Sequence, residues 1–332
     1  MAVPGRSCPM SYRYRPEDLA IPSQRTATTL FIVGCLYGNV AALTAVLARA
    51  EQEDPPATIV FNGDFHHLDI EDDAFSTVGR GVARHLMTLG NVEAALIAGA
   101  DDAGCGCAYP DYIDDAIVER SNAVVAELRE TASRHDDLVK LLAPLPRHLT
   151  INVGGLRVGV IHGDPESLAG WSLALEALEP GDAAVRQSTG WRGTPTTQAT
   201  VADWLRRAQV RVLACTHTGL PYAQDYQVDG QRHVVINNGA AGLPDFHHRS
   251  EGVVTRLSAQ PVTPSDSLYG TTLDGVRCDA LPLRYDAVAW RNQFLAAWPP
   301  GSPAHTSYAA RVTHGTDLSV RQSARGTIEV SH

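Results

Sequence analysis

TIVFNGDFHH, residues 58–67, is a short apolar run that ends abruptly in Gly-Asp and two histidines. A β-branched run closed by glycine is typical of a buried strand. In an open α/β sheet, groups at the carboxyl ends of strands line the ligand crevice, so Asp64 is predicted to lie there. A carboxylate in that place needs a partner: a metal ion, a base or a phosphate-bearing ligand. The alternative is that Asp64 only caps a helix after the strand.

Length and composition set the broad class. The chain has 332 residues, of which 44% are hydrophobic, so it can supply a sizeable core. It contains no run near the roughly 20 apolar residues of a membrane span, and residues 1–15 lack the apolar segment of a signal peptide. We therefore expect a soluble, cytoplasmic protein without a membrane partner.

Charge and cysteine content narrow the partners. The formal net charge of -10 argues against nucleic acid as the main partner, because proteins that bind it usually present basic patches. Small substrates stay open. The six cysteines of this long chain are expected to be free thiols or ligands and not a disulfide framework. Cys105 and Cys107 are spaced too tightly for an ordinary structural zinc pair; inert packing is favoured over a redox or metal pair.

Strands and helices are predicted to alternate in the first half. The expected strands are 29–34, 58–62 and 92–99, and the expected helices are 40–49 and 72–88. Such alternation favours a mainly parallel sheet with its chemistry on the loops that leave the strands. A long helical segment over 109–142 has charges that alternate in sign, which is typical of a solvated face and not of a binding site.

The second half favours antiparallel pairing. A hairpin pattern with a Gly-Gly turn over 149–161 leads into His162. A helix at about 197–208 and a strand at 210–214 lead into His217, and a further hairpin ends at Asn238. The whole indicates two packed mixed sheets with helices outside.

The order of these motifs resembles the calcineurin-like metallophosphoesterases, most closely the small bacterial branch that includes phosphodiesterases, over about residues 30–257. The family pattern is Asp-x-His-Gly-Asn, Gly-Asp, Gly-Asn-His-Asp/Glu, His-Gly, Gly-His-x-His and Asn-Pro-Gly-Ser-x-Gly. The resemblance implies an α/β fold, a four-layer αββα sandwich of two mixed β-sheets. We expect an irregular lead-in at 1–27, the main domain at 28–260 with a helical insertion at about 103–147, and a packing extension with one amphipathic helix at 261–332.

Several positions depart from the pattern. In the first motif the aspartate falls on Cys35 and the histidine on Tyr37, while Gly38-Asn39 match. Asp64 falls on the aspartate that bridges two metals in the family, and His162 falls on the lone histidine. Of the two histidines in Gly-His-x-His, the first is His217 and the second is replaced by Gly219.

The third motif can be placed in two ways. GNVE at 90–93 matches in letters, but it would precede the strand expected at 92–99. GADD at 99–102 follows that strand, as the family geometry requires, and this second placement is preferred.

The two placements differ in what survives. On the preferred one, the metal-binding Asn becomes Ala100 and the histidine that assists the leaving group becomes Asp101. On the other, Asn91 survives and that histidine becomes Val92. Either way, the catalytic histidine is missing.

The family's two metal sites are retained unequally. One keeps Asp64, His162 and His217; a carboxylate and two imidazoles suit Zn, Fe or Mn and leave open positions for water or substrate. The other keeps only Asp64, with Cys35 and Tyr37 as candidates for unusual ligands. We therefore expect a divalent transition metal, as one ion, or as two if the second site is rebuilt.

Rebuilding the second site would need new ligands. His67 lies three residues after Asp64, where the purple acid phosphatase relatives place a tyrosine ligand, so it could supply an imidazole. Cys35 could bind as a thiolate, which favours a softer metal such as Zn or Fe. The opposing interpretation is that Cys35 is a small buried hydrophobe.

The inherited chemistry is metal-assisted hydrolysis of a small phosphorylated molecule. The candidates for proton transfer to the leaving oxygen are Asp101, His66 and His67, although histidines in such loops are often merely solvated. Asn39 and Asn238 are candidates for substrate binding. Two alternatives stay open: a catalytically inactive relative that binds a ligand or partner, and a site repurposed for other, for example redox, chemistry. The extension is also a candidate contact in a homo-oligomer.

Overall fold

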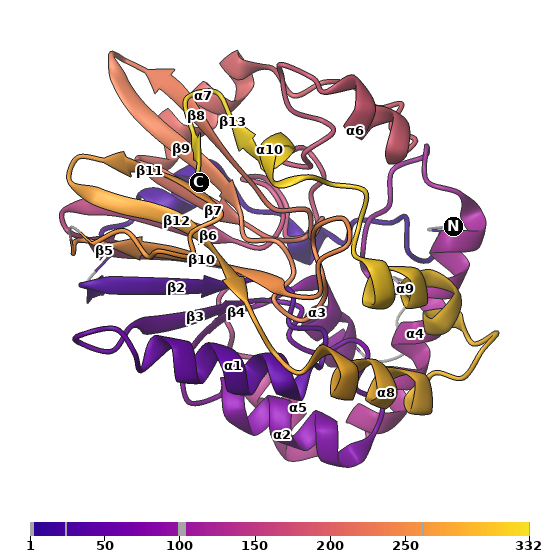
Figure 1. Ribbon diagram of the computed structural model, residues 1–332. Helices are drawn as coiled ribbons and strands as arrows, with labels where there is room; N and C mark the ends of the chain where they lie inside the picture. The colour runs from indigo at the N-terminus through magenta and orange to yellow at the C-terminus, as the bar shows by residue number, and fades with distance from the viewer. Residues whose placement is uncertain (1–2, 24, 99–103, 261, 332) are drawn as a thin grey trace.

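The computed structural model describes residues 3–23, 25–98, 104–260 and 262–331. Two seven-stranded mixed sheets pack face to face, and helices cover their outer faces (Figure 1). This is the expected four-layer αββα sandwich. None of the helices within these ranges is long and apolar enough to cross a membrane.

The first sheet contains β3 (Thr58–Asn62), the strand that leads into Asp64. Its parallel part is β2, β3 and β4, and β10 pairs antiparallel with both β2 and β12. In spatial order its strands are β14 (Glu329–Val330), β11 (Tyr269–Leu273), β12 (Val276–Leu283), β10 (Gly252–Ser258), β2 (Thr29–Val33), β3 (Thr58–Asn62) and β4 (Leu86–Thr88).

The second sheet contains the predicted hairpins. The hairpin β5–β6 and the hairpin β8–β9 are antiparallel, and β7 runs parallel to both β6 and β9. In spatial order its strands are β1 (Thr26–Ala27), β5 (His148–Val153), β6 (Leu156–Ile161), β7 (Val212–Cys215), β9 (Gln231–Asn237), β8 (Tyr222–Val228) and β13 (Ala324–Arg325).

Strand β2 shows how the layers are held together. All five of its residues are buried, because both of its faces are covered. Leu30 and Ile32 belong to the core shared by the two sheets, whereas Phe31 and Val33 pack with helices α1 (Val40–Ala50) and α2 (Asp72–Val82). The sheet therefore separates two apolar layers.

The prediction of a strand at 92–99 is wrong. Residues Asn91–Ala98 form helix α3, and the strand of this region is the three-residue β4, inside the helix that we expected at 72–88. The first six residues of α3 are all buried, so the helix lacks the one-sided apolar stripe that would reveal its period. The correction matters for the site, because Gly90-Asn91 now follows a strand.

Other helices also differ from expectation. The segment at 109–142 holds two helices, α4 (Asp115–Ala132) and α5 (Asp136–Leu142), and not one. Further along are the short helix α6 (Ala183–Ser188) and the predicted α7 (Gln198–Ala208). The lead-in contains the 3-10 turns η1 (Met10–Tyr12) and η2 (Pro16–Ala20).

The C-terminal region is more than one helix. It adds β11, β12 and β14 to the first sheet and β13 to the second, so it is woven into both. Its helices are α8 (Ala287–Ala297), α9 (Pro303–His314) and the short α10 (Val320–Ser323). In Figure 1, α8 and α9 lie beside α4 at one end of the sandwich, where the strands β2 and β3 end.

Candidate metal centre

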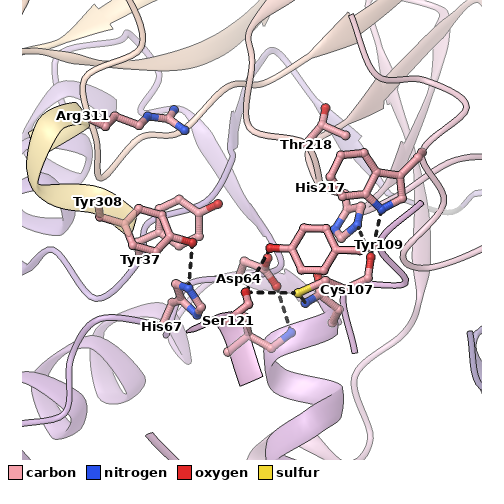
Figure 2. A pocket seen from close by; sticks show the side chains of 13 residues that line it. Tyr37, Asp64, His67, Cys107, Tyr109, Ser121, His217, Thr218, Tyr308 and Arg311 are labelled. Atoms are coloured by element: carbon pink, nitrogen blue, oxygen red, sulfur yellow. Dashed lines mark hydrogen bonds between the residues drawn. The ribbon is translucent and has the colours of Figure 1, made fainter. Parts of the chain in front are cut away.

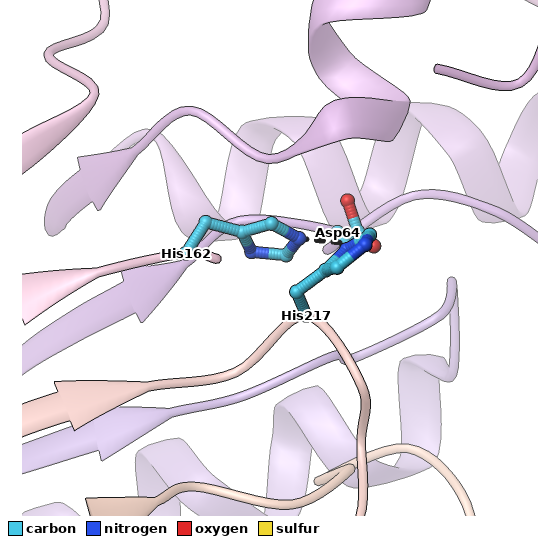
Figure 3. A group of neighbouring side chains, drawn as sticks. All are labelled: Asp64, His162 and His217. Atoms are coloured by element: carbon cyan, nitrogen blue, oxygen red, sulfur yellow. Dashed lines mark ion pairs between the residues drawn. The ribbon is translucent and has the colours of Figure 1, made fainter. Parts of the chain in front are cut away.

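Three of the predicted side chains converge at this end of the sandwich. Asp64 follows β3 in one sheet, while His162 and His217 follow β6 and β7 in the other. Their ligand atoms all lie within 4.8 Å of one another, and all three residues are buried (Figure 3). Among the described residues, this is the one group of three or more His, Cys, Asp or Glu side chains close enough to hold a metal ion.

The turn after β3 gives Asp64 its position. Asp64 has a φ of 52°, in the left-handed region that few non-glycine residues adopt, and Gly63 before it has a φ of 72°. A Cβ on Gly63 would lie only 2.5 Å from Gly90 Cα, so this close approach of two loops requires glycine. The carboxylate of Glu93 accepts a hydrogen bond from the backbone N–H of Asp64 at 2.7 Å, which fixes the strained turn.

Both histidines are oriented by backbone carbonyls. Nδ1 of His162 lies 2.8 Å from the carbonyl oxygen of Asn62, and Nε2 of His217 lies 3.1 Å from that of Cys107. In the neutral rings these nitrogens carry the protons, which leaves lone pairs on Nε2 of His162 and Nδ1 of His217. Nδ1 of His217 is buried without a hydrogen-bond partner.

Asn91 brings a further oxygen to the same place. Its Nδ2 donates to the carbonyl oxygen of Cys105 at 3.1 Å and to Sγ of Cys107 at 3.4 Å. Its Oδ1 therefore turns toward Nε2 of His162, at 3.2 Å. The placement of the third motif at 99–102 was preferred because a strand was expected at 92–99, and that expectation is wrong. Asn91, from the placement at 90–93, is the residue that lies beside the trio.

The charges of the trio are coupled. Burial acts to raise the pKa of Asp64, but the charge of His162 brings that pKa below its ordinary value. Nε2 of His162 lies 3.3 Å from Oδ2 of Asp64. Burial acts to lower the pKa of His162, and Asp64 overcomes this and raises it. Burial, followed by the charge of His162, lowers the pKa of His217 to about 4. Burial and the charge of Asp64 raise the pKa of Glu93 to about 7.

The donor set fits a divalent transition metal. Two imidazole nitrogens and a carboxylate converge, and the other ring N–H of each histidine donates to a backbone carbonyl. Among the described residues, the lone pair on Nδ1 of His217 has no hydrogen-bond partner. Histidine ligands of protein-bound metals show this same outer hydrogen bond. Zn, Fe and Mn accept such ligands, and Oδ1 of Asn91 is available as a fourth.

A cavity of about 160 Å³ opens beside the trio (Figure 2). Asp64, Asn91 and His217 contribute to its wall. Three aromatic side chains that belong to none of the predicted motifs also line it: Tyr109, Trp171 and Tyr308. The remaining lining residues are Tyr37, His67, Val92, Cys107, Ser121, Thr218 and Arg311.

Comparison with known proteins identifies the family. The sequence model of the family described as calcineurin-like phosphoesterase matches residues 28–225. The chain belongs to this family. It is a family of metal-dependent phosphoesterases, so a group of side chains that could hold a metal ion agrees with it. Among curated protein sequences, none matches the chain.

Two solved structures share the fold. A hypothetical protein of Pyrococcus horikoshii is 15% identical, with a TM-score of 0.54, and the match covers 88% of this chain and all of that one. A metallophosphoesterase of Sphaerobacter thermophilus is 16% identical, with a TM-score of 0.51, and the match covers 87% of this chain and all of that one.

The two described residues among the predicted catalytic ones, His66 and His67, lie in different places. His67 lines the cavity, with Nε2 3.0 Å from the hydroxyl of Tyr308. His66 does not line it: its ring stacks on Phe75 at 4.1 Å, and its Nδ1 lies 2.6 Å from Asp69. Asp101 lies outside the described residues, so its role stays a prediction.

The two predicted substrate-binding residues do not line the cavity. Asn39 is fully buried; its side chain caps α1 by accepting from the N–H of Ala42 and donates to the carbonyl of Gly242. Asn238 is likewise buried and donates to the carbonyl of Cys215. The structure gives both residues a place in loop packing.

The half of the site that departs from the calcineurin-like phosphoesterase pattern is filled by side chains. Cys35 lies in an apolar cluster, does not line the cavity, and has a thiol pKa that burial raises well above its ordinary value. Tyr37 does line the cavity, and its hydroxyl lies 3.6 Å from where a Cβ on Gly219 would be. A larger side chain at 219 would therefore compete with Tyr37 for the same space.

Sequence reasoning missed most of the cavity wall. Tyr109 and Ser121 belong to the segment that we expected to be only a solvated face, and Arg311 belongs to the expected packing extension. Cys107, for which inert packing was favoured, also lines the cavity. No motif marks these residues, and only the tertiary fold brings them together.

Proposed function

We propose that this chain hydrolyses a phosphoester of a small molecule with a single divalent transition metal ion, held by Asp64, His162 and His217 with Oδ1 of Asn91 as a fourth ligand. The observation that carries the proposal is the convergence of these side chains with both imidazoles fixed by backbone carbonyls. Such an ion lowers the pKa of a bound water towards neutrality and neutralises charge on phosphoryl oxygens.

The chain's own groups would divide the remaining tasks. Burial lowers the pKa of His67 below its ordinary value, so its imidazole is neutral at neutral pH and suited to accept a proton. Its Nδ1 is buried and has no partner, while Nε2 faces the hydroxyl of Tyr308. His67 is therefore our candidate general base; His66, whose ring faces Phe75, is not.

The size of the cavity limits what enters it. At about 160 Å³ it is smaller than the roughly 300–1,000 Å³ typical of sites that enclose a whole drug-sized ligand. We therefore assign the cavity to the phosphoryl group, with the rest of the substrate outside it. The aromatic rings of Tyr109 and Trp171 on its wall offer a surface for that remainder.

Metal content and hydrolysis together test the proposal. The chain would be purified without added metal, analysed for its elements, and assayed with a nitrophenyl phosphomonoester and the corresponding diester. We expect about one transition metal ion per chain and metal-dependent hydrolysis of one of the two esters. Asp64→Asn should lose both, whereas Asp203→Asn, at an exposed carboxylate in α7, should keep both.

The other outcomes favour the two alternatives. Metal without hydrolysis would favour a repurposed centre. Neither metal nor hydrolysis would favour an inactive relative that binds a ligand or partner. That alternative has one supporting observation: Val92, and not a histidine, follows Asn91 at the start of α3.

A further inference from the structure

The C-terminal region completes the wall of the cavity that lies away from the metal trio. Helix α9 places Tyr308 and Arg311 there, next to Tyr37 and His67 (Figure 2). In Figure 2 these four side chains lie on one side of Asp64, and His217 lies on the other. No sequence motif assigns a task to Tyr308 or Arg311.

Three hydrogen bonds fix the guanidinium of Arg311 and, among the described residues, leave its Nη1 without a partner. Its Nε donates to the carbonyl of Pro244 at 3.1 Å, and its Nη2 donates to the carbonyl of Gly219 at 2.9 Å and to Asp245 at 2.7 Å. Within the described chain, Nη1 has no hydrogen-bond partner. It lies 3.8 Å from where a Cβ on Gly219 would be, so the absence of a side chain at 219 leaves room beside the guanidinium.

The neighbours of Arg311 in the cavity are neutral donors. Burial raises the pKa values of the Tyr37 and Tyr308 hydroxyls, so both stay protonated. The carboxylate that pairs with Arg311, Asp245, is fully buried and does not line the cavity. The wall therefore presents one fixed cation, two hydroxyls and the imidazole of His67, which pairs with the Tyr308 hydroxyl. The carboxylate that lines the cavity, Asp64, belongs to the metal trio and not to this wall.

We propose that Arg311, with the hydroxyls of Tyr37 and Tyr308, forms a subsite for the non-bridging oxygens of a phosphoryl group. A guanidinium matches the geometry of phosphate oxygens, and hydrogen bonds between charged partners are about twice as strong as neutral ones. The fixed guanidinium supplies a second positive charge across the cavity from the metal trio. This inference rests on the proposed function for its ligand, but binding of phosphate does not require turnover.

Titration with inorganic phosphate tests the subsite. Binding would be measured by calorimetry on the full chain, once after treatment with a chelator and once loaded with Mn²⁺. We expect Arg311→Gln to weaken phosphate binding by about 10- to 100-fold in both states, the usual range for a lost charged hydrogen bond. Arg120→Gln is the matched control, because Arg120 also contacts α9, through Ser307, but lies outside the cavity.

Phosphate affinity unchanged in a folded Arg311→Gln protein overturns the subsite. If this variant does not fold, Tyr37→Phe and Tyr308→Phe test the subsite, because each removes a hydroxyl and keeps the ring. A loss of phosphate affinity of about threefold or more in either variant supports the subsite, and unchanged affinity in both overturns it. Arg311-dependent phosphate binding in a protein without hydrolysis would sink the proposed function and leave the subsite standing. Hydrolysis by a protein whose phosphate affinity does not depend on Arg311 would support the proposed function and overturn the subsite.

Discussion

Asn91 shows how one amide is aimed by its surroundings. Its Nδ2 hydrogen bonds to Cys105 and Cys107 leave Oδ1 as the atom that faces His162. If Oδ1 is a ligand, Asn91→Ala should weaken metal affinity by roughly 10-fold or more, the scale of a lost ligand-shell contact. Asn91→Asp keeps an oxygen in place and should retain the metal. Competition with a chromophoric chelator measures both; equal affinities in wild type and Asn91→Ala would remove Asn91 from the centre.

His67 makes a prediction about pH and stability. Burial lowers its pKa in the folded protein below the ordinary 6.5, so the unfolded chain takes up this proton more readily. The contribution of His67 to stability is present above about pH 6.5 and is lost as the pH falls toward the lower folded value, by at most about 1.4 kcal/mol per pH unit. His67→Gln should therefore lose less unfolding free energy than wild type between about pH 7.5 and pH 5.

Denaturant titrations at the two pH values measure this difference. Tyr308→Phe serves as the control, because it removes the hydroxyl that contacts His67 and leaves the imidazole. Its pH dependence should match that of wild type. A His67→Gln protein with the full wild-type pH dependence would show that His67 is not held neutral by burial.

At the scale of elements, helix α3 secures the loop that carries Asp64. The buried carboxylate of Glu93, in its first turn, accepts hydrogen bonds from the N–H groups of Asp64 at 2.7 Å, Gly90 at 3.1 Å and His66 at 3.3 Å. Glu93→Ala would leave three buried donors without an acceptor and should cost about 3 kcal/mol or more. Glu93→Gln keeps one acceptor oxygen and should cost less. Urea unfolding measures both, and a loss below about 1 kcal/mol in Glu93→Ala would contradict this account of the loop.

The sequence was informative where an element has one clear period and a polar exit. β3 is a short apolar run ended by Gly63, and the hairpin β5–β6 turns at Gly154-Gly155 and runs from Ile161 directly into His162. The ends of these strands therefore located Asp64 and His162 correctly. α3 is buried on nearly every side, and β4 has only three residues, so neither shows a period. The wrong placement of the third motif followed from that lack of pattern.

The candidate site was predictable only as far as the motifs extended. Asp64, His162 and His217 follow strands and match a known order, so their convergence could be expected. Tyr308 and Arg311 lie in a helix nearly a hundred residues further along the chain than His217, and their approach to the cavity depends on how the C-terminal region packs. A side chain delivered by long-range packing leaves no local signal in the sequence.

For the whole molecule, the centre joins the two sheets. Asp64 comes from one sheet and both histidines come from the other, and Asn62 bridges them by donating to the carbonyl of Ile161 at 2.7 Å and to Thr216 at 2.8 Å. A metal ion bound only by the folded protein should add about 2.7 kcal/mol of stability at a hundred times its dissociation constant. We expect a chelator to lower the melting temperature of wild type and to leave Asp64→Asn unchanged; equal effects on both proteins would contradict the link.

The C-terminal helices are tied to the domain through Trp298. This side chain is 2% exposed, packs with Leu68 and Ala304, and donates from its indole nitrogen to the carbonyl of Leu68 at 2.9 Å. Trp298→Ala should cost about 3–5 kcal/mol, the usual range for a buried tryptophan. Since α9 packs in the same cluster, its amides should also exchange faster and phosphate affinity should fall. Leu295→Ala, at a more exposed position of α8, is the control for helix α8 itself. Faster exchange with unchanged phosphate affinity would show that the cavity keeps its shape without a firmly docked α9.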